Sequence, residues 1–232
     1  MIEFKNVVLQ YHYDDFALLK GVSFQLPAGV NTILADTQSG KSSICKLLTK
    51  DVVPTDGEIA IDGANISCIT NADLGILYLP SKPVLFENRS ARFNIEYPLK
   101  VRKVAKKQRK TVAEQIALSL QIDFLDEKVK KLSDEQRKIV ALARGLTVKR
   151  KIVLFDDFFE VDEDLSLSLA HIDGVLGMFN NATCVILTSD KRLARGNTVV
   201  MDGGLAVYVG EAGGAKSIVD NLVWIDERIR SK

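Results

Sequence analysis

The sequence predicts an α/β fold with a phosphate-binding loop, an antiparallel β part near its start and a helical insert at about residues 88–150. Three observations support this fold class. Residues 35–43 stand between an apolar run and a helix-like segment, where a phosphate-binding loop is found. Strand-like and helix-like stretches then alternate, which indicates a largely parallel sheet. Residues 2–26 carry two strand-like runs close together, which is typical of an antiparallel pair.

Composition limits the possible functions. The 232 residues, 47% of them hydrophobic, are enough for one large domain with a buried core. Lys+Arg 31 against Asp+Glu 30 gives a net charge of +1, so no overall attraction to nucleic acid or to an anionic membrane is expected. No apolar stretch reaches the roughly 20 residues that cross a bilayer, and no signal-peptide pattern is present. We therefore expect a cytosolic chain.

Three cysteines, an odd number, are scattered among apolar neighbours. These are Cys45, Cys68 and Cys184. The pattern predicts small buried side chains in a reducing compartment rather than disulfides.

The expected elements follow in order. Residues 2–10 and 18–26 form the antiparallel pair, 30–34 the strand before the phosphate-binding loop, and 57–61 and 75–79 two further strands. The periodicity is helical over residues 89–121, with the clearest helix at 111–120 and a second at 132–146. Strands at 151–155 and 183–188 flank a helix at about 164–178, and a hairpin around 202–204 precedes a C-terminal helix at about 214–231. The periodicity of apolar residues supports each assignment. We expect one domain over residues 1–232, with the insert as a helical subdomain.

The phosphate-binding loop carries its chemistry in Gly40-Lys41-Ser42. Backbone N–H groups and the start of the following helix hold phosphates, Lys41 adds a positive charge, and the Ser42 hydroxyl is a ligand for Mg²⁺. Ala35 replaces the first glycine of the pattern, and its Cβ narrows the backbone choices of the turn. The other candidate nucleotide-contacting residues of the loop are Gln38, Ser39 and Ser43.

Two further segments carry a family resemblance. Residues 132–144, beginning Leu-Ser-Asp-Glu-Gln, resemble the LSGGQ signature and following helix of ATP-binding-cassette (ABC) ATPases, and residues 152–157 resemble their Walker B strand. Their order and their distances from the phosphate-binding loop agree with that family over residues 2–210. The resemblance implies the ABC-type P-loop fold, ATP and Mg²⁺ as ligands, and head-to-tail dimers with ATP at the interface.

The resemblance also assigns roles to residues. Asp156 is the Mg²⁺-side carboxylate, Asp157 takes the position of the general base, and Tyr11 matches the aromatic residue that stacks on adenine, with Tyr13 and Phe16 as competitors. The signature positions are Ser133, Asp134, Glu135 and Gln136, and the D-loop carboxylate is Asp162, or Glu163 if no gap is allowed.

Several positions depart from the family. Ser81 replaces the Q-loop glutamine, Ser189 stands where the switch histidine is expected, Asp157 is one methylene shorter than glutamate, and Asp134 and Glu135 replace the two signature glycines. Sensing of the γ-phosphate and catalysis are thus altered, while Lys41, Ser42 and Asp156, which hold nucleotide and metal, are kept. The pattern predicts ATP binding with weak hydrolysis.

The region after residue 94 bears on partners. Asn94–Lys100 resembles the segment that faces the membrane subunit in ABC ATPases, and residues 100–110 hold seven basic residues and no acid. The basic stretch is either a solvated helix face or a contact for acidic headgroups or a permease. Nucleic acid is not expected, since no aromatic residues are interleaved with the charges.

The leading hypothesis is the ATP-binding subunit of an ABC transporter, peripheral on the inner face of a membrane through a permease subunit, and paired with a second ATPase subunit that need not be identical. The alternative is a non-catalytic, nucleotide-dependent scaffold or regulator. A DNA- or translation-acting ABC protein is disfavoured, because such proteins usually carry long inserts or a second cassette.

Overall fold

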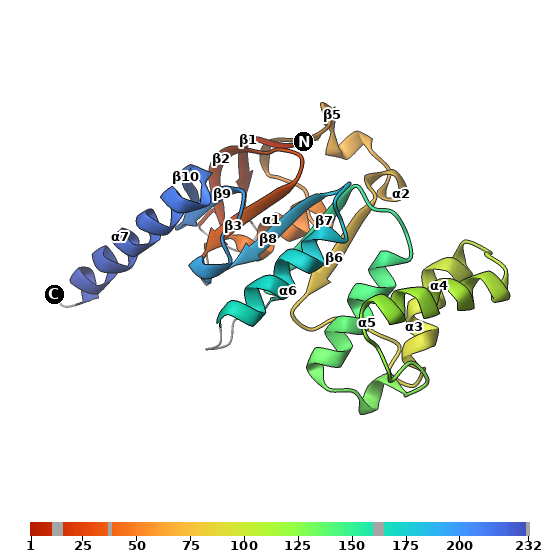
Figure 1. The fold of residues 1–232 in the computed structure, drawn as a ribbon. Coiled ribbons are helices and arrows are strands. Elements are labelled where there is room, and N and C mark those ends of the chain that lie inside the picture. Colours follow the sequence, from red (N-terminus) through yellow and green to blue (C-terminus); the bar gives the residue numbers. More distant parts are fainter. Residues whose placement is uncertain (11–15, 37–38, 160–164, 231–232) are drawn as a thin grey trace. The chain divides into compact units, whose positions relative to one another are not determined.

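The structure is a computed structural model and describes residues 1–10, 16–36, 39–159 and 165–230. The chain divides into two compact units, each described by itself below. The first comprises Met1–Tyr78 and Lys151–Lys232, and the second comprises Leu79–Arg150. Figure 1 labels their helices and strands.

The first unit contains an antiparallel sheet with the strand order β2-β1-β4-β5. Its strands are β1 (Ile2–Leu9), β2 (Leu19–Leu26), β4 (Asp56–Ile61) and the short β5 (Ala64–Asn65). The predicted antiparallel pair at the start of the chain is confirmed, because β1 pairs with β2 from Ile2 opposite Leu26 onward.

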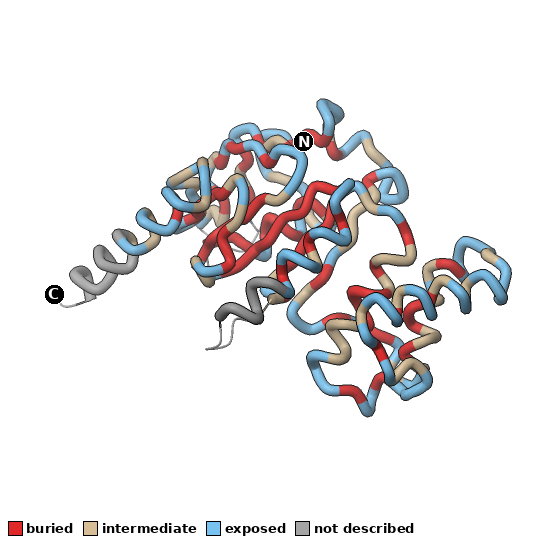
Figure 2. Tube along the Cα trace, viewed as in Figure 1, coloured by how far each residue is buried: buried red, intermediate tan, exposed pale blue. Residues whose placement is uncertain are grey.

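The six-stranded sheet of this unit has the order β10-β9-β3-β8-β7-β6. Its strands are β3 (Val30–Ala35), β6 (Ile76–Pro80), β7 (Ile152–Asp156), β8 (Thr183–Thr188), β9 (Asn197–Asp202) and β10 (Leu205–Glu211). Strand β3 pairs in parallel with β8 and β9, and β8 pairs in parallel with β7, whereas β10 closes an antiparallel hairpin with β9. The carboxyl ends of β3, β7 and β8 therefore share one edge. Figure 2 shows these central strands buried.

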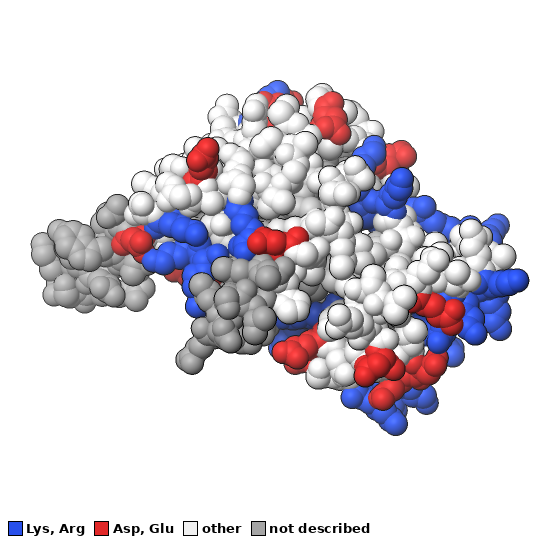
Figure 3. All heavy atoms as spheres, viewed as in Figure 1, with Lys and Arg blue, Asp and Glu red and all other residues white. Residues whose placement is uncertain are grey.

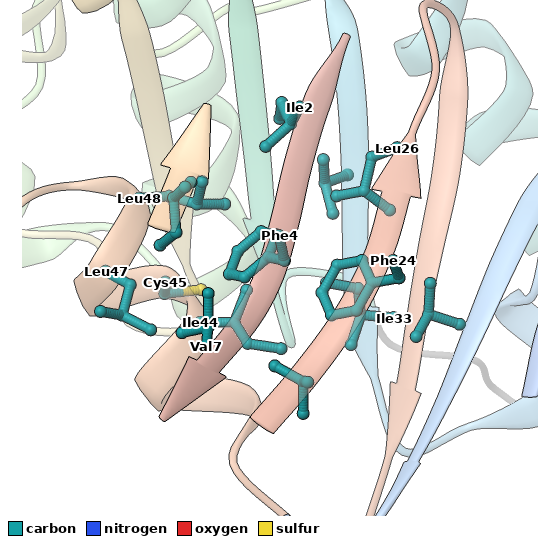
Figure 4. Close-up of a cluster of buried hydrophobic side chains, with 14 of the residues drawn as sticks. Ile2, Phe4, Val7, Phe24, Leu26, Ile33, Ile44, Cys45, Leu47 and Leu48 are labelled. Carbon is teal, nitrogen blue, oxygen red and sulfur yellow. The ribbon is translucent and has the colours of Figure 1, made fainter. Parts of the chain in front are cut away.

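Helix α1 (Lys41–Leu48) is fixed by the main hydrophobic core. Its buried side chains Ile44, Leu47 and Leu48 belong to one cluster with Phe4 of β1, whose ring stacks on that of Phe24 at 4.5 Å (Figure 4). Because the helix begins at Lys41, this packing also fixes the position of that residue at the end of the phosphate-binding loop.

The other helical elements of the first unit are η1 (Ile66–Cys68), α2 (Asn71–Leu74), α6 (Leu165–Gly177), η3 (Lys191–Leu193) and α7 (Ala212–Arg230). Helix α7 packs through Ala215 on Leu34 and Val200 of the six-stranded sheet. Within the described ranges, no helix has the length and apolar character needed to span a bilayer.

The second unit is helical, with α3 (Ala91–Val101), α4 (Lys106–Ser119), η2 (Val129–Lys131) and α5 (Asp134–Leu146). Ser90 caps α3 by accepting a hydrogen bond from the Phe93 N–H. Asn94 is fully buried, and its amide bonds Phe86 and Ser90, which ties the preceding loop to α3.

Two expectations from the sequence need correction. Cys68 is exposed, whereas Cys45 and Cys184 are buried as expected. It ends the single-turn η1, which follows the edge strand β5 and buries only Ile66 of its three residues. The helix expected most clearly at residues 111–120 begins earlier, at Lys106, within the helical stretch expected over 89–121, because basic residues with good helix propensity extend it without contributing to an apolar face.

Candidate functional site

The phosphate-binding loop connects β3 to α1 at the carboxyl edge of the six-stranded sheet. Ala35 is the last residue of β3, is buried, and pairs with Met201 of β9. Ala35 does not adopt a positive φ, so its Cβ fits the strand without strain. The concern raised by the missing first glycine therefore does not apply to the backbone observed here.

The backbone conformation at position 40 requires glycine. Its φ of 92° is left-handed, and a Cβ there would lie 2.6 Å from the Leu19 side chain. Gly40 is the N-cap of α1, but no side chain of the described residues caps this helix, and its first turn holds no acid. The first N–H groups of α1 are thus available to an anion.

The side chains around this helix start match a phosphate ligand. Lys41 is 8% exposed, Ser39 and Ser43 are buried, and Ser42 is exposed. A cation, hydroxyl groups and uncapped N–H groups are the donors that phosphate oxygens accept. The donor set fits the Mg²⁺-nucleotide that the sequence predicts.

Lys41 is paired with Asp157. The Lys41 Nζ lies 2.7 Å from a carboxylate oxygen of Asp157, whose side chain is 48% exposed. Asp157 has a left-handed φ of 44°, and its N–H donates to the Leu187 carbonyl at 2.9 Å. The predicted base is therefore in direct contact with the lysine that would hold phosphate.

Asp156 ends β7 and accepts a hydrogen bond from the Tyr78 hydroxyl at 2.8 Å. The Cys45 thiol of α1 also interacts with this carboxylate. Burial, followed by the contact with Asp156, raises the pKa of both Tyr78 and Cys45 above their ordinary values. Both groups therefore remain protonated at neutral pH and can donate to the Asp156 carboxylate.

Tyr78 was not among the site residues predicted from the sequence. It belongs to β6, the neighbour of β7 in the sheet. Tyr78 could have been found from its place near the end of a strand that lies beside the Walker B strand, but the order of strands in a sheet cannot be determined from one sequence.

Ser189 follows β8 at the same edge of the sheet and is exposed. The next residue, Asp190, donates its N–H to Thr188 Oγ1 at 3.0 Å and caps the short helix η3. The hydrogen bond from Arg192 lowers the pKa of Asp190. The backbone at this position is therefore anchored, but the side chain that it presents is a hydroxyl instead of an imidazole.

Magnesium ligation depends on few protein groups. In the part of the chain that the structure describes, no three His, Cys, Asp or Glu side chains form a metal-binding cluster. Ser42 and Asp156 can supply two oxygen ligands, and phosphate oxygens and water would complete the six that Mg²⁺ prefers. The set fits an ion that arrives with a nucleotide.

Three predicted site residues, Tyr11, Gln38 and Asp162, lie outside the described residues, as do the alternatives Tyr13 and Glu163. Phe16, the other alternative for stacking on adenine, is described and 80% exposed.

The signature residues and Ser81 belong to the second unit. Ser133 is the N-cap of α5 and forms a capping box with Gln136, whose Oε1 accepts from the Ser133 N–H at 3.0 Å. Asp134 and Glu135 occupy the exposed first turn of α5. Ser81 is exposed in the loop after β6. The carboxylates suit a helix start, where they interact favourably with the helix dipole.

The second unit also contains a pocket of about 480 Å³ beside α3 and α5. Its apolar lining includes Phe86 and Tyr97, and its three charged residues are Arg102, Arg144 and Arg150, with no carboxylate in the lining. Burial lowers the pKa of Arg144 and Arg150, and the nearby charge of Arg102 lowers that of Arg150 further. The pocket therefore presents incompletely solvated positive charge.

Comparisons with known proteins agree with this geometry. The family model described as ABC transporter matches residues 19–160. The chain is 32% identical over 188 residues to the Fe(3+) ions import ATP-binding protein FbpC of Mannheimia succiniciproducens. The match covers 78% of this chain and 53% of that protein, so the chain spans about half the length of the curated relative.

Two solved structures share the fold. The dimeric post-hydrolysis structure of the ATP-binding cassette MJ0796 with ADP and Pi has a TM-score of 0.75 at 22% identity, covering 91% of this chain and 99% of that one. A bacterial Atm1-family ABC exporter with ATP bound has a TM-score of 0.74 at 24% identity, covering 92% and 39%. These matches confirm the predicted α/β fold of ABC-ATPase type.

Proposed function

This chain belongs to the ABC transporter family of ATP-binding proteins, and we propose that it is the cytoplasmic ATP-binding subunit of such a transporter, with weak hydrolysis of its own. The observation that carries the proposal is the arrangement at the carboxyl edge of the sheet. There the uncapped start of α1 and the buried Lys41 share an edge with Asp156. These groups would hold the phosphates of Mg-ATP.

Weak hydrolysis is supported by what surrounds these groups. Asp157 is bound to Lys41 in the resting site, and Ser189 offers no imidazole to organise a lytic water or the charge of the transition state. Asp157 is also shorter than the glutamate of the family. The groups that would bind ATP are therefore retained in this chain, whereas those that would catalyse its hydrolysis are altered.

A membrane transport subunit is the proposed second partner. The arginine-lined pocket would accept an acidic residue on an apolar segment. Its wall is apolar, and its three guanidinium groups have no acidic partner among the residues that the structure describes. Basic side chains also gather over α4 in Figure 3. Among the described residues, Arg102, Lys103, Lys106 and Lys107 have no acidic partner.

The test combines binding with turnover. The natural chain should bind Mg-ATP, and Lys41→Ala should abolish binding. Lys20→Ala, which changes an exposed lysine of β2, serves as the matched control. Turnover should stay well below the common enzyme range of roughly 1–10 s⁻¹. Unchanged ATP affinity in Lys41→Ala would remove the site assignment, and ordinary turnover would remove the claim of weak hydrolysis.

The degenerate catalytic positions favour a second candidate, a non-catalytic nucleotide-dependent scaffold or regulator. Isolation of the native complex from membranes separates the two proposals. A transport subunit that co-purifies and transports its substrate only with this chain supports the first. A soluble complex whose assembly follows ATP binding, without turnover, supports the second.

A further inference from the structure

We propose that Tyr78 is a positioning residue that limits Asp156 to holding a metal ion through one carboxylate oxygen, and thereby sets a preference for Mg²⁺ over Ca²⁺. The inference rests on the proposed Mg-ATP site and extends it to the selection of the ion. It assigns a role to the tyrosine hydroxyl, which belongs to a residue outside the phosphate-binding loop.

The geometry starts from two neighbouring strands. Tyr78 lies on β6 and Asp156 at the end of β7, and the Tyr78 hydroxyl donates to Asp156 Oδ2 at 2.8 Å. Tyr78 is 39% exposed, so it reaches the carboxylate from the rim of the site. Cys45, on α1, approaches the same carboxylate from the side of the phosphate-binding loop. Asp156 is thus oriented by donors from two elements.

A hydrogen bond to one oxygen changes how a carboxylate can bind metal. Ca²⁺ takes six to eight oxygen ligands and often uses both oxygens of a carboxylate, whereas Mg²⁺ demands an octahedron and usually takes one oxygen, or a water held by it. The Tyr78 hydroxyl competes for Oδ2 in the two-oxygen mode but not in the one-oxygen mode. It therefore disfavours the larger ion.

Substitution by phenylalanine isolates the hydroxyl, because the ring and its packing are retained. We expect Tyr78→Phe to weaken binding of Mg-ATP about tenfold, which is at the lower end of the loss seen when a partner of a metal ligand is removed. Binding of Ca-ATP should weaken less or become tighter. Binding of ATP without divalent ion should be unchanged, since Lys41 and the loop are untouched.

Tyr208→Phe is the matched control. Its hydroxyl donates to the Glu211 carbonyl at 3.0 Å, in the hairpin of β10, outside the site. Calorimetry on the full chain measures the affinities of the natural protein, Tyr78→Phe and Tyr208→Phe for ATP alone, Mg-ATP and Ca-ATP. Melting temperatures confirm that each variant is folded. A lower ratio of Mg-ATP to Ca-ATP affinity in Tyr78→Phe alone supports the proposal.

Two results would overturn it. An unchanged Mg-to-Ca ratio in Tyr78→Phe rejects the selective role, and this includes an equal loss for both ions, which indicates a purely structural effect. Absence of Mg-ATP binding by the natural chain would reject the proposed function itself, and the inference with it. The natural chain is measured first, so the two failures are distinguishable.

Discussion

The ammonium group of Lys41 and the carboxylate of Asp157 form an ion pair at 2.7 Å, with the lysine almost buried and the aspartate half exposed. Asp157 therefore occupies one of the positions around Lys41 where a phosphate oxygen would bind. A nucleotide that enters the site must displace this carboxylate, so we expect Asp157 to oppose ATP binding.

Asp157→Asn should consequently raise the affinity for ATP. A partly exposed ion pair contributes up to about 1 kcal/mol, which corresponds to an increase of up to about fivefold in affinity. Titration calorimetry with Mg-ATP measures it. Asp173→Asn, on α6, removes an ion pair with Arg195 and is the control, which should leave affinity unchanged. Weaker ATP binding in Asp157→Asn would contradict this role.

The catalytic positions can be tested by restoring the family residues. Asp157→Glu with Ser189→His should raise ATP turnover by about tenfold or more, since a positioned acid or base typically contributes 10²–10⁴-fold. Both positions lie at the carboxyl edge of the same sheet. Steady-state phosphate release measures the gain, with Asp157→Asn/Ser189→His as the inactive control. No gain in a folded double variant would place the lesion in the signature instead.

Asn94 gives a prediction of stability. Its fully buried amide accepts from the Phe86 N–H at 2.8 Å and donates to the Ser90 carbonyl at 2.9 Å. Asn94→Ala leaves the Phe86 N–H without its partner, whereas the Ser90 carbonyl still accepts from the backbone N–H of residue 94. The loss should cost about 1–3 kcal/mol of unfolding free energy. Urea unfolding measures it. Asn65→Ala, at a partly exposed cap of η1, should cost less.

The cysteines should differ in reactivity. Burial raises the pKa of Cys184 to about 11, and burial together with Asp156 raises that of Cys45, whereas Cys68 is exposed. At pH 8 iodoacetamide should modify Cys68 first, because the thiolate is the reactive form. The raised pKa values mean that Cys45 and Cys184 hold their protons more tightly in the folded chain than in the unfolded chain. The free energy of unfolding should therefore fall as the pH rises above the ordinary cysteine pKa. Mass spectrometry of the native protein at successive times measures the labelling of each cysteine.

Much of the fold was predictable, because apolar alternation and the phosphate-binding pattern are local. The strands around Lys41 and the antiparallel start follow from their own residues. The Tyr78–Asp156 contact did not follow, since it depends on β6 lying beside β7. The Lys41–Asp157 pair joins residues far apart in the sequence. The exposure of Cys68 was not predictable either, because it depends on the place of β5 at the edge of its sheet and not on the apolar neighbours of Cys68 in the sequence.

The last prediction concerns the signature. In the ABC family the two glycines of LSGGQ let the start of the following helix approach the γ-phosphate of the opposite subunit. Here those positions are Asp134 and Glu135, exposed on the first turn of α5. As local structure they are favourable, gaining about 0.3–1 kcal/mol each from the helix dipole.

Against a phosphate the sign of this interaction reverses. A unit charge about 5 Å from another costs roughly 3 kcal/mol at an effective dielectric constant of 20, before screening by salt. That repulsion exceeds the dipole gain, and two acidic side chains also obstruct close approach. In the described part of the chain, neither Asp134 nor Glu135 has a basic partner that would neutralise it.

Two copies of this chain should therefore not form a tight, symmetric ATP-bound dimer, and a partner with an intact signature should close the site built on Lys41. Sedimentation with and without ATP compares the natural chain with Asp134→Gly/Glu135→Gly, and the double glycine variant should self-associate more strongly. Glu127→Gln, in the loop before η2, removes one negative charge from the same unit away from the signature and serves as the control. Tight ATP-induced dimers of the natural chain, unaffected by the glycines, would show that the carboxylates turn away from the phosphate.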